Sequence, residues 1–223
     1  MKIFGKVISI VAATVISNTW WKFEQNLASV YAQYRASVRF KIQPILPLTL
    51  ILAEDRRFYR HGGVDPIAIV RAIWCSMVKK MWTGGSTIEQ QLVRTLTGRY
   101  ERTLYRKVKE ILLASLVNRV VPKVDIPGVY LSVAYFGWQM NGIQQVSRRL
   151  GIELANIRIH QAASIIARLK YPEPRVPPPQ RARQITRRTE FLMKLVVNHC
   201  LSSHSAKKEI KKYETILDYR ALQ

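Results

Sequence analysis

The sequence predicts an all-α fold, and three observations support this prediction. Apolar residues recur at intervals of three and four along most of the chain, which is the spacing of one helix face. Alternating apolar and polar runs, which are typical of half-buried strands, are scarce. Helix-start signals precede apolar segments, as at Asp65-Pro66, where an N-cap residue is followed by proline.

The helices are expected in this order along the chain. An amphipathic helix over 22–40 comes first, and an apolar helix over 44–53 ends at Glu54. After Gly84-Gly85, Ser86 and Glu89 have the spacing of a capping box that begins another helix. The remaining helices are expected over 67–81, 103–120, 125–136, 159–169 and 180–199, with a loop over 137–142 and an extended segment over 172–179.

These elements divide the chain into four parts. We expect residues 1–21 to form a membrane anchor or signal segment, 22–41 a juxtamembrane amphipathic helix, 42–200 the main domain and 201–223 a basic tail. Lys2 and Lys6 precede the apolar run 7–17, and Trp20-Trp21 follow it, which is the order of an anchor that leads out of the cytoplasm. The run is shorter than the roughly 20 residues of a full span. A cleaved signal peptide and an interfacial helix are therefore the alternatives.

Charge and cysteine content exclude several classes of protein. The formal net charge of +22 predicts attraction to a polyanion or to an anionic membrane surface. Nucleic acid is not the expected partner, because the chain has no zinc-ligand pattern and no aromatic RNA-binding strand. No C-x-x-C or histidine-rich tract predicts a metal site, and the distant Cys75 and Cys200 are expected to be inert.

Three clusters carry the chemistry. The first follows the helix over 44–53 and reads E-D-R-R-F-Y-R-H-G-G, from Glu54 to Gly63. The second, over 84–91, reads G-G-S-T-I-E-Q-Q, and the third, over 106–110, reads R-K-V-K-E. Together they resemble the ordered motifs E-D-x-x-F-x-x-H-x-G, G-x-S-T-I-x-Q-Q and R-K-x-x-E of the peptidoglycan glycosyltransferases, the family 51 transglycosylases. The resemblance covers about residues 42–195 and implies a lysozyme-like fold.

The resemblance implies that the chain polymerises lipid II into glycan strands by an inverting displacement that releases undecaprenyl diphosphate. Glu54 corresponds to the catalytic glutamate and is expected to be the general base, with a pKa raised by burial. Glu110 is the second catalytic carboxylate, which holds the basic residues and the donor diphosphate in register. A divalent cation, Mg²⁺ or Mn²⁺, at the diphosphate is compatible with this role.

Basic residues are expected to stabilise the charge of the leaving diphosphate. Ser86, Thr87 and Gln90 lie at a helix N-terminus, where backbone N–H groups favour an anion or a sugar oxygen. Two alternatives stay open: His61 as a turn residue, and Arg106 as an ordinary ion-pair partner of Glu110 on a solvated face. The full set expected to bind substrate is Asp55, His61, Ser86, Thr87, Gln90, Gln91, Arg94, Arg102, Arg106 and Lys107.

The fourth family motif is only partly kept. The family reads K-x-x-I-L-E-x-Y-L-N, whereas this chain reads K-V-D-I-P-G-V-Y-L-S over 123–132, so that Gly128 and Ser132 replace a glutamate and an asparagine. We expect this departure to have one of three consequences: slow turnover, short glycan products or dependence on a partner. The final R-R-x-x-x-L element matches over 187–192 and is expected to support the fold.

Two further functions compete with synthesis. A lytic transglycosylase or lysozyme-like enzyme would use the same glutamate to cut glycan, but the Q-Q-x-x-R and R-K-x-x-E elements favour the diphosphate-leaving reaction. A catalytically weak lipid II-binding protein is the other alternative.

The expected location is the bacterial inner membrane, with one span and the catalytic domain on the outer face. The expected partners are lipid II, the growing strand, the anionic membrane surface and cell-wall synthases. We expect no transpeptidase domain, because K-T-G is absent and the chain ends shortly after the last motif.

Overall fold

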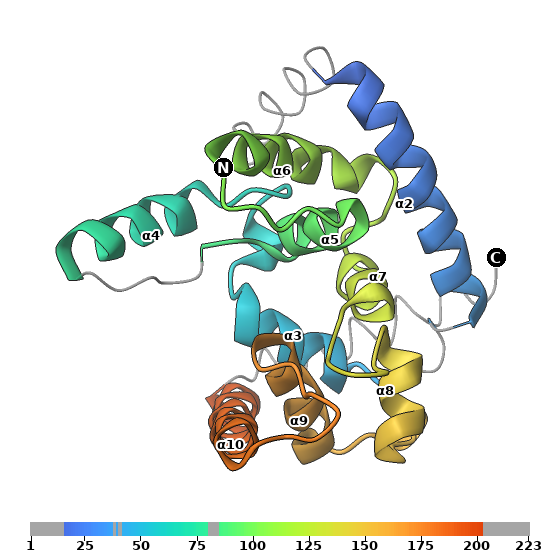
Figure 1. Ribbon diagram of the computed structural model, residues 1–223, viewed down its shortest axis with the longest axis vertical. Coiled ribbons are helices and arrows are strands. Elements are labelled where there is room, and N and C mark those ends of the chain that lie inside the picture. The colour runs from blue at the N-terminus through green and yellow to red at the C-terminus, as the bar shows by residue number, and fades with distance from the viewer. Residues whose placement is uncertain (1–15, 38, 40–41, 80–84, 203–223) are drawn as a thin grey trace. The chain divides into compact units, whose positions relative to one another are not determined.

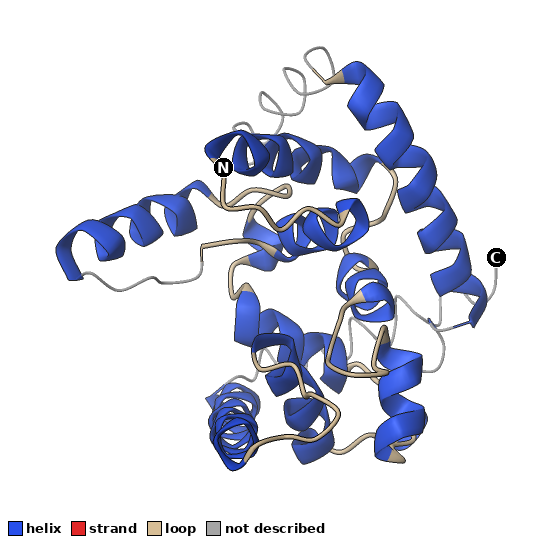
Figure 2. Cartoon of the chain, viewed as in Figure 1, coloured by secondary structure: helices blue, strands red, loops and turns tan. Residues whose placement is uncertain are grey.

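The computed structural model describes residues 16–37, 39, 42–79 and 85–202, and every regular element within these ranges is a helix (Figure 1, Figure 2). The prediction of an all-α fold is thus confirmed. The only pairings of extended backbone in this part of the chain are two isolated bridges, Tyr135 with Asn141 and Gly137 with Glu173. The elements are α2 (Ser17–Ser37), α3 (Ile45–Glu54), η2 (Phe58–Arg60), α4 (Pro66–Lys79), α5 (Ile88–Thr97), α6 (Leu104–Leu116), η3 (Val117–Arg119), α7 (Ile126–Val133), α8 (Ile143–Leu150), η4 (Leu154–Asn156), α9 (Ile159–Lys170) and α10 (Pro179–Ser202).

The helices differ from the expected ones at several places, and α7 ends at Val133, three residues before its expected end. Helix α2 begins at Ser17, several residues before the predicted start, and α6 gives way to the 3₁₀ turn η3 after Leu116. Helix α8 was not predicted from the sequence. It has eight residues and buries only Ile143 and Val146, so its apolar pattern is too short to be recognised.

The predicted capping box at the start of α5 is wrong. Thr87, not Ser86, is the N-cap residue, and its Oγ1 accepts a hydrogen bond of 3.3 Å from the backbone N–H of Gln90. The side chain of Glu89 does not return to the helix start, because it is fully buried and forms an ion pair with Lys123. A tertiary ion pair has therefore replaced the returning contact of the capping box, while Thr87 still caps the helix.

The chain forms two compact units. The first comprises Met1–Ala36 and Glu54–Val133, and the second comprises Ser37–Ala53 and Ala134–Gln223. In the first unit, α5 packs against both α6 and α7. Its apolar face is fully buried at Ile88 and Leu92. Helix α5 is thus the central support of this unit.

The motif between Glu54 and Gly63 is held against α6 by close backbone packing. Gly63 has a φ of 100°, and a Cβ at this position would lie 2.1 Å from the carbonyl oxygen of Ala114. Only glycine combines this backbone conformation with such a close approach. The loop that follows Glu54 is therefore fixed on the first unit.

The second unit is built on the packing of α9 against α10. Leu48 and Leu52 of α3 form a buried cluster with Val196 of α10. Arg188 of α10 donates a hydrogen bond of 3.3 Å to the carbonyl oxygen of Ala53, one residue before Glu54. These contacts secure the helix that leads to Glu54.

The predicted membrane anchor is only partly within the described residues. In those residues, no helix combines the length and the apolar character needed to cross a bilayer. Residues 1–15 and the tail 203–223 lie outside the described ranges. The apolar face of α2 packs within the first unit, with Phe23, Leu27 and Tyr34 buried.

Candidate active site

Glu54 lies at the last position of α3 and is half-buried. Its Oε2 accepts a hydrogen bond of 3.3 Å from Nε2 of Gln91 on α5. The Oε1 of the same glutamine accepts a hydrogen bond of 2.9 Å from the hydroxyl of Tyr130 on α7. Burial, and next the negative charge of Glu54, raise the pKa of Tyr130, so its hydroxyl stays a donor. Tyr130 is buried, and the structure adds its contact with Gln91 to the site.

Glu110 on α6 is the centre of a second cluster. Its side chain is almost fully buried, and both carboxylate oxygens accept from cationic groups. Arg94 reaches it from α5 in a bidentate contact, with Nε 3.0 Å from Oε2 and Nη2 3.1 Å from Oε1. Lys107 Nζ lies 2.6 Å from Oε1, and Arg106 Nη1 pairs with Oε2. The Arg106–Glu110 pair is thus present, but as part of a network of three cations.

The charges in this cluster shift one another's titration. Burial by itself raises the pKa of Glu110, but hydrogen bonds from Arg94 and Lys107 outweigh it, and the net pKa is lowered. The hydrogen bond to Glu110 raises the pKa of Arg94. Burial lowers the pKa of Lys107 despite its contact with Glu110. At neutral pH Glu110 is therefore ionised, with two arginines and one lysine around it.

Ser86 and Gln90 extend this cluster to the N-terminus of α5. Lys107 Nζ donates to Oε1 of Gln90 at 2.7 Å and to Oγ of Ser86 at 3.0 Å. Arg94 Nη2 lies 3.4 Å from the same serine oxygen. The lysine therefore joins α6 to the segment that carries the second motif.

Asp55 and His61 form a separate buried pair next to Glu54. The Nε2 of His61 lies 3.0 and 3.1 Å from the two carboxylate oxygens of Asp55. Asp55 also accepts the backbone N–H of Ile88 at 3.3 Å, at the first residue of α5. Thr87 Oγ1 donates to the carbonyl oxygen of Gly63 at 2.7 Å. These contacts tie the first motif to the start of α5.

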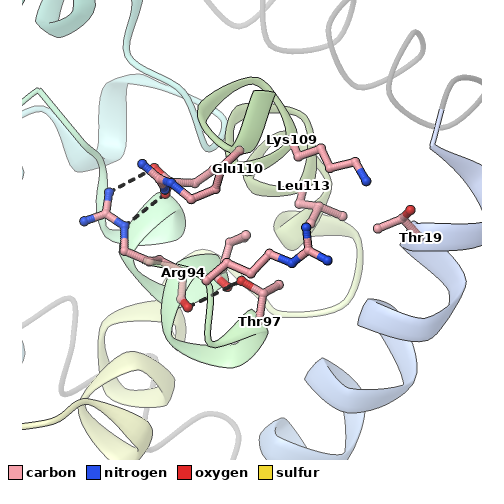
Figure 3. A pocket seen from close by; sticks show the side chains of 9 residues that line it. Thr19, Arg94, Thr97, Lys109, Glu110 and Leu113 are labelled. Carbon is pink, nitrogen blue, oxygen red and sulfur yellow. Dashed lines mark hydrogen bonds and ion pairs between the residues drawn. The ribbon is translucent and has the colours of Figure 1, made fainter. Parts of the chain in front are cut away.

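A pocket of about 160 Å³ lies beside Glu110. In Figure 3, Arg94 reaches toward Glu110, whereas Thr19 of α2 stands on the other side of the pocket. Arg99 and Lys109 add positive charge and were not predicted, although Lys109 lies inside the third motif. The lining residues are Thr19, Val93, Arg94, Thr97, Arg99, Arg106, Lys109, Glu110 and Leu113.

All of the residues expected to bind substrate lie in the first unit, and Arg94 and Arg106 are the two of them that line the pocket. Arg102 is exposed, precedes the N-cap residue Thr103 of α6 and is not among the lining residues. Ser132 on α7 donates to the carbonyl oxygen of Val129 at 2.7 Å, which is a local helix contact.

The site thus combines a half-buried glutamate with a cluster of arginines and a lysine, and the two parts are joined through α5. Comparison with known proteins identifies the family. The family model described as transglycosylase matches residues 24–197, so the chain belongs to the transglycosylase family.

Three curated proteins show the extent of the sequence similarity. It is 32% identical to penicillin-binding protein 1A of Aquifex aeolicus over 168 residues, which cover 74% of this chain and 23% of that protein. It is 32% identical to penicillin-binding protein 1A of Escherichia coli over 158 residues, 70% of this chain and 19% of that protein. Identity to penicillin-binding protein 1B of Haemophilus influenzae is 34% over 159 residues, 68% of this chain and 20% of that protein. The chain thus matches about a fifth of the length of these relatives.

Proposed function

We propose that the protein polymerises lipid II into peptidoglycan glycan strands, with release of undecaprenyl diphosphate. The family assignment supports a peptidoglycan glycosyltransferase of lysozyme-like architecture. In the proposed reaction, the 4-hydroxyl of one sugar attacks the anomeric carbon of a second sugar, which is bonded to the lipid diphosphate. The bond to the lipid diphosphate breaks as the new glycosidic bond forms, and the hydroxyl proton passes to a base.

Glu54 is the proposed base. It is half-buried, so it is accessible to a hydroxyl group, and Gln91 holds its Oε2. Tyr130 in turn fixes the orientation of that glutamine. A base in a fixed position is favourable because proton transfer requires the carboxylate within hydrogen-bond distance of the attacking hydroxyl.

The cations around Glu110 are the proposed clamp for the leaving diphosphate. Arg94 and Arg106 line the pocket and keep further N–H donors besides those used on the carboxylate. Arg99 and Lys109 increase the positive charge of the same pocket. Fixed cations stabilise charge that develops as the sugar–phosphate bond breaks. Glu110 then acts by holding these cations in place.

One observation carries the proposal: two adjacent residues of α5 connect the base to the clamp. Gln91 contacts Glu54, while Gln90 contacts Lys107 of the cluster around Glu110. The base and the cations therefore share one rigid support. A reaction with one base and one anionic leaving group needs this arrangement, whereas hydrolysis of a neutral glycan has no use for the cations.

Glu110 is a poor ligand for a divalent cation. Both of its oxygens already accept from arginine or lysine. We therefore assign no step to Mg²⁺ or Mn²⁺. Asp55 and His61 are proposed to hold the loop after Glu54, since their buried contacts are with each other and with the start of α5.

The proposed location is the outer face of the bacterial inner membrane, with residues 1–21 as a single anchor. Exposed apolar residues of the first unit support contact with a lipid surface, as does the net charge of +22. These exposed residues include Val70 and Trp74 of α4, Tyr100, and Leu104, Tyr105 and Val108 of α6. Cell-wall synthases are proposed partners.

The decisive experiment supplies purified full-length protein with labelled lipid II. We expect a polymer that lysozyme digests. Cleavage of preformed glycan without polymer formation would instead support the lytic function. Binding of lipid II without turnover would support the binding protein.

A further inference from the structure

Glu89 is a buried carboxylate to which neither the proposed base nor the clamp assigns a role. It lies on α5 between Ile88 and Gln90, and its side chain has no exposed area. Its Oε1 forms an ion pair with Lys123, and its Oε2 has no hydrogen-bond partner within the described residues. A buried charge is costly unless it is paired. The contact with Lys123 is thus what makes this position tolerable.

Lys123 connects that carboxylate to the segment after Glu54. Its ammonium group lies 3.9 Å from the ring centroid of Phe58, which is fully buried in the turn η2. The ion pair of Glu89 and Lys123 therefore connects α5 with the segment before α7, and Lys123 also contacts the first motif at Phe58. The attraction between a cation and the face of an aromatic ring is stronger where water is largely excluded.

Asp55 and His61 also lie close to Glu89. One potential ligand atom from each of the three residues lies within 4.8 Å of the others. The cluster is nevertheless unsuited to a metal ion. Nδ1 of His61 accepts the backbone N–H of Gly63 at 3.2 Å, so the proton is on Nε2, which donates to Asp55. The group that would bind a metal is thus already occupied.

We propose that Glu89 is a positioning residue for the reaction. Through its ion pair with Lys123 it fixes the first turn of α5, where the next two residues, Gln90 and Gln91, contact Lys107 and Glu54. Glu89 occupies a variable position of the second motif, so the motif itself gives it no role. This inference rests on the proposed function, because the glutamines matter only if Glu54 and the cations act together.

The test is a double-mutant cycle on polymerisation. Glu89→Gln keeps the shape of the side chain and removes its charge. We expect kcat to fall at least about tenfold, while KM for lipid II changes less than about twofold, because misplaced catalytic groups slow the chemical step. Lys123→Gln should have a similar effect. The double variant should be no slower than either single variant, because both act through one contact.

The ion pair of Arg168 and Glu173 in the second unit is a matched control. It is also largely buried, with Arg168 Nη2 2.6 Å from Glu173 Oε2. Glu173→Gln should lower the melting temperature to a similar extent and leave kcat unchanged. An equal loss of kcat in this control would overturn the inference, as would multiplicative losses in the cycle.

Hydrogen exchange separates this inference from the proposed function. In Glu89→Gln, the amides of 88–94 should exchange faster than in the wild type, while those of α9 should be unaffected. This readout needs no activity. A wild type that fails to polymerise lipid II would refute the proposed function alone, whereas unchanged exchange at 88–94 would refute the positioning role.

Discussion

Gly128 of α7 lies directly against the ring of Tyr34 of α2. A Cβ on this glycine would lie 2.3 Å from the hydroxyl oxygen of Tyr34 and 2.6 Å from its Cζ. Tyr34 is buried, so its ring fills the space next to the helix. The departure from the family's glutamate therefore has a packing reason. A side chain at this position therefore requires the ring of Tyr34 to move.

Replacement of Gly128 should test this packing directly. Gly128→Ala should lower the free energy of unfolding in the wild-type background, because overpacking costs about 1–3 kcal/mol, more than the helix-propensity gain of about 1 kcal/mol. In a Tyr34→Ala background the same change should be stabilising. Urea unfolding of the four proteins measures both effects. The same sign in both backgrounds would contradict the packing explanation.

Gly128→Glu should not restore activity, for the same reason. The longer side chain must displace Tyr34, so we expect a lower melting temperature and no gain in polymer length or rate. The assay compares product length on labelled lipid II with thermal unfolding. A faster and stably folded Gly128→Glu protein would show instead that the missing carboxylate limits this enzyme.

Glu54→Gln should abolish polymerisation and leave lipid II binding nearly intact. The amide oxygen can still accept the hydrogen bond from Gln91, but the side chain no longer takes up a proton. Loss of a general base costs about 10²–10⁴-fold in kcat. Glu153→Gln in the second unit is the matched control. Activity within a few-fold of the wild type would refute the assignment of the base.

Arg106→Ala should slow turnover by about a hundredfold, because it removes a fixed cation from the pocket beside Glu110. Arg102→Ala should have a smaller effect, since Arg102 is exposed and does not line the pocket. Arg183→Ala, an exposed site on α10, is the control for general loss of charge. Equal rates for all three variants would mean that the basic residues of α6 do not bind the diphosphate.

The lowered pKa of Glu110 predicts a pH dependence of stability. Its ordinary pKa is 4.5, and in the folded protein the pKa lies below this value. As pH falls below 4.5, the unfolded chain takes up the proton first, so the stabilisation by Glu110 is lost through the folded-state pKa. The wild type should therefore have a higher free energy of unfolding than Glu110→Gln above pH 4.5. This difference between the two proteins should become smaller as the pH falls below that value. Urea unfolding from about pH 7 to about pH 3 measures the difference. A constant gap would refute the pKa assignment.

The helical fold and most of the site could be predicted from the sequence, because both depend on local patterns. Apolar spacing identifies helix faces, and the three motifs identify Glu54, Gln91 and Glu110 as candidate site residues. The burial of Glu89 in the core, in place of a cap on α5, could not be predicted in this way. Capping competes with burial, and the outcome depends on whether a partner such as Lys123 is present in space.

The amino-acid sequence by itself determined the helices, the family motifs and the chemical identity of the proposed base and clamp. Only the tertiary structure decided that Gln90 and Gln91 link these two halves, that Gly128 accommodates Tyr34, and that Arg102 lies outside the pocket. The physical reason is that these contacts join residues from different helices. Their geometry follows from how the helices pack, which no short-range pattern in the sequence specifies.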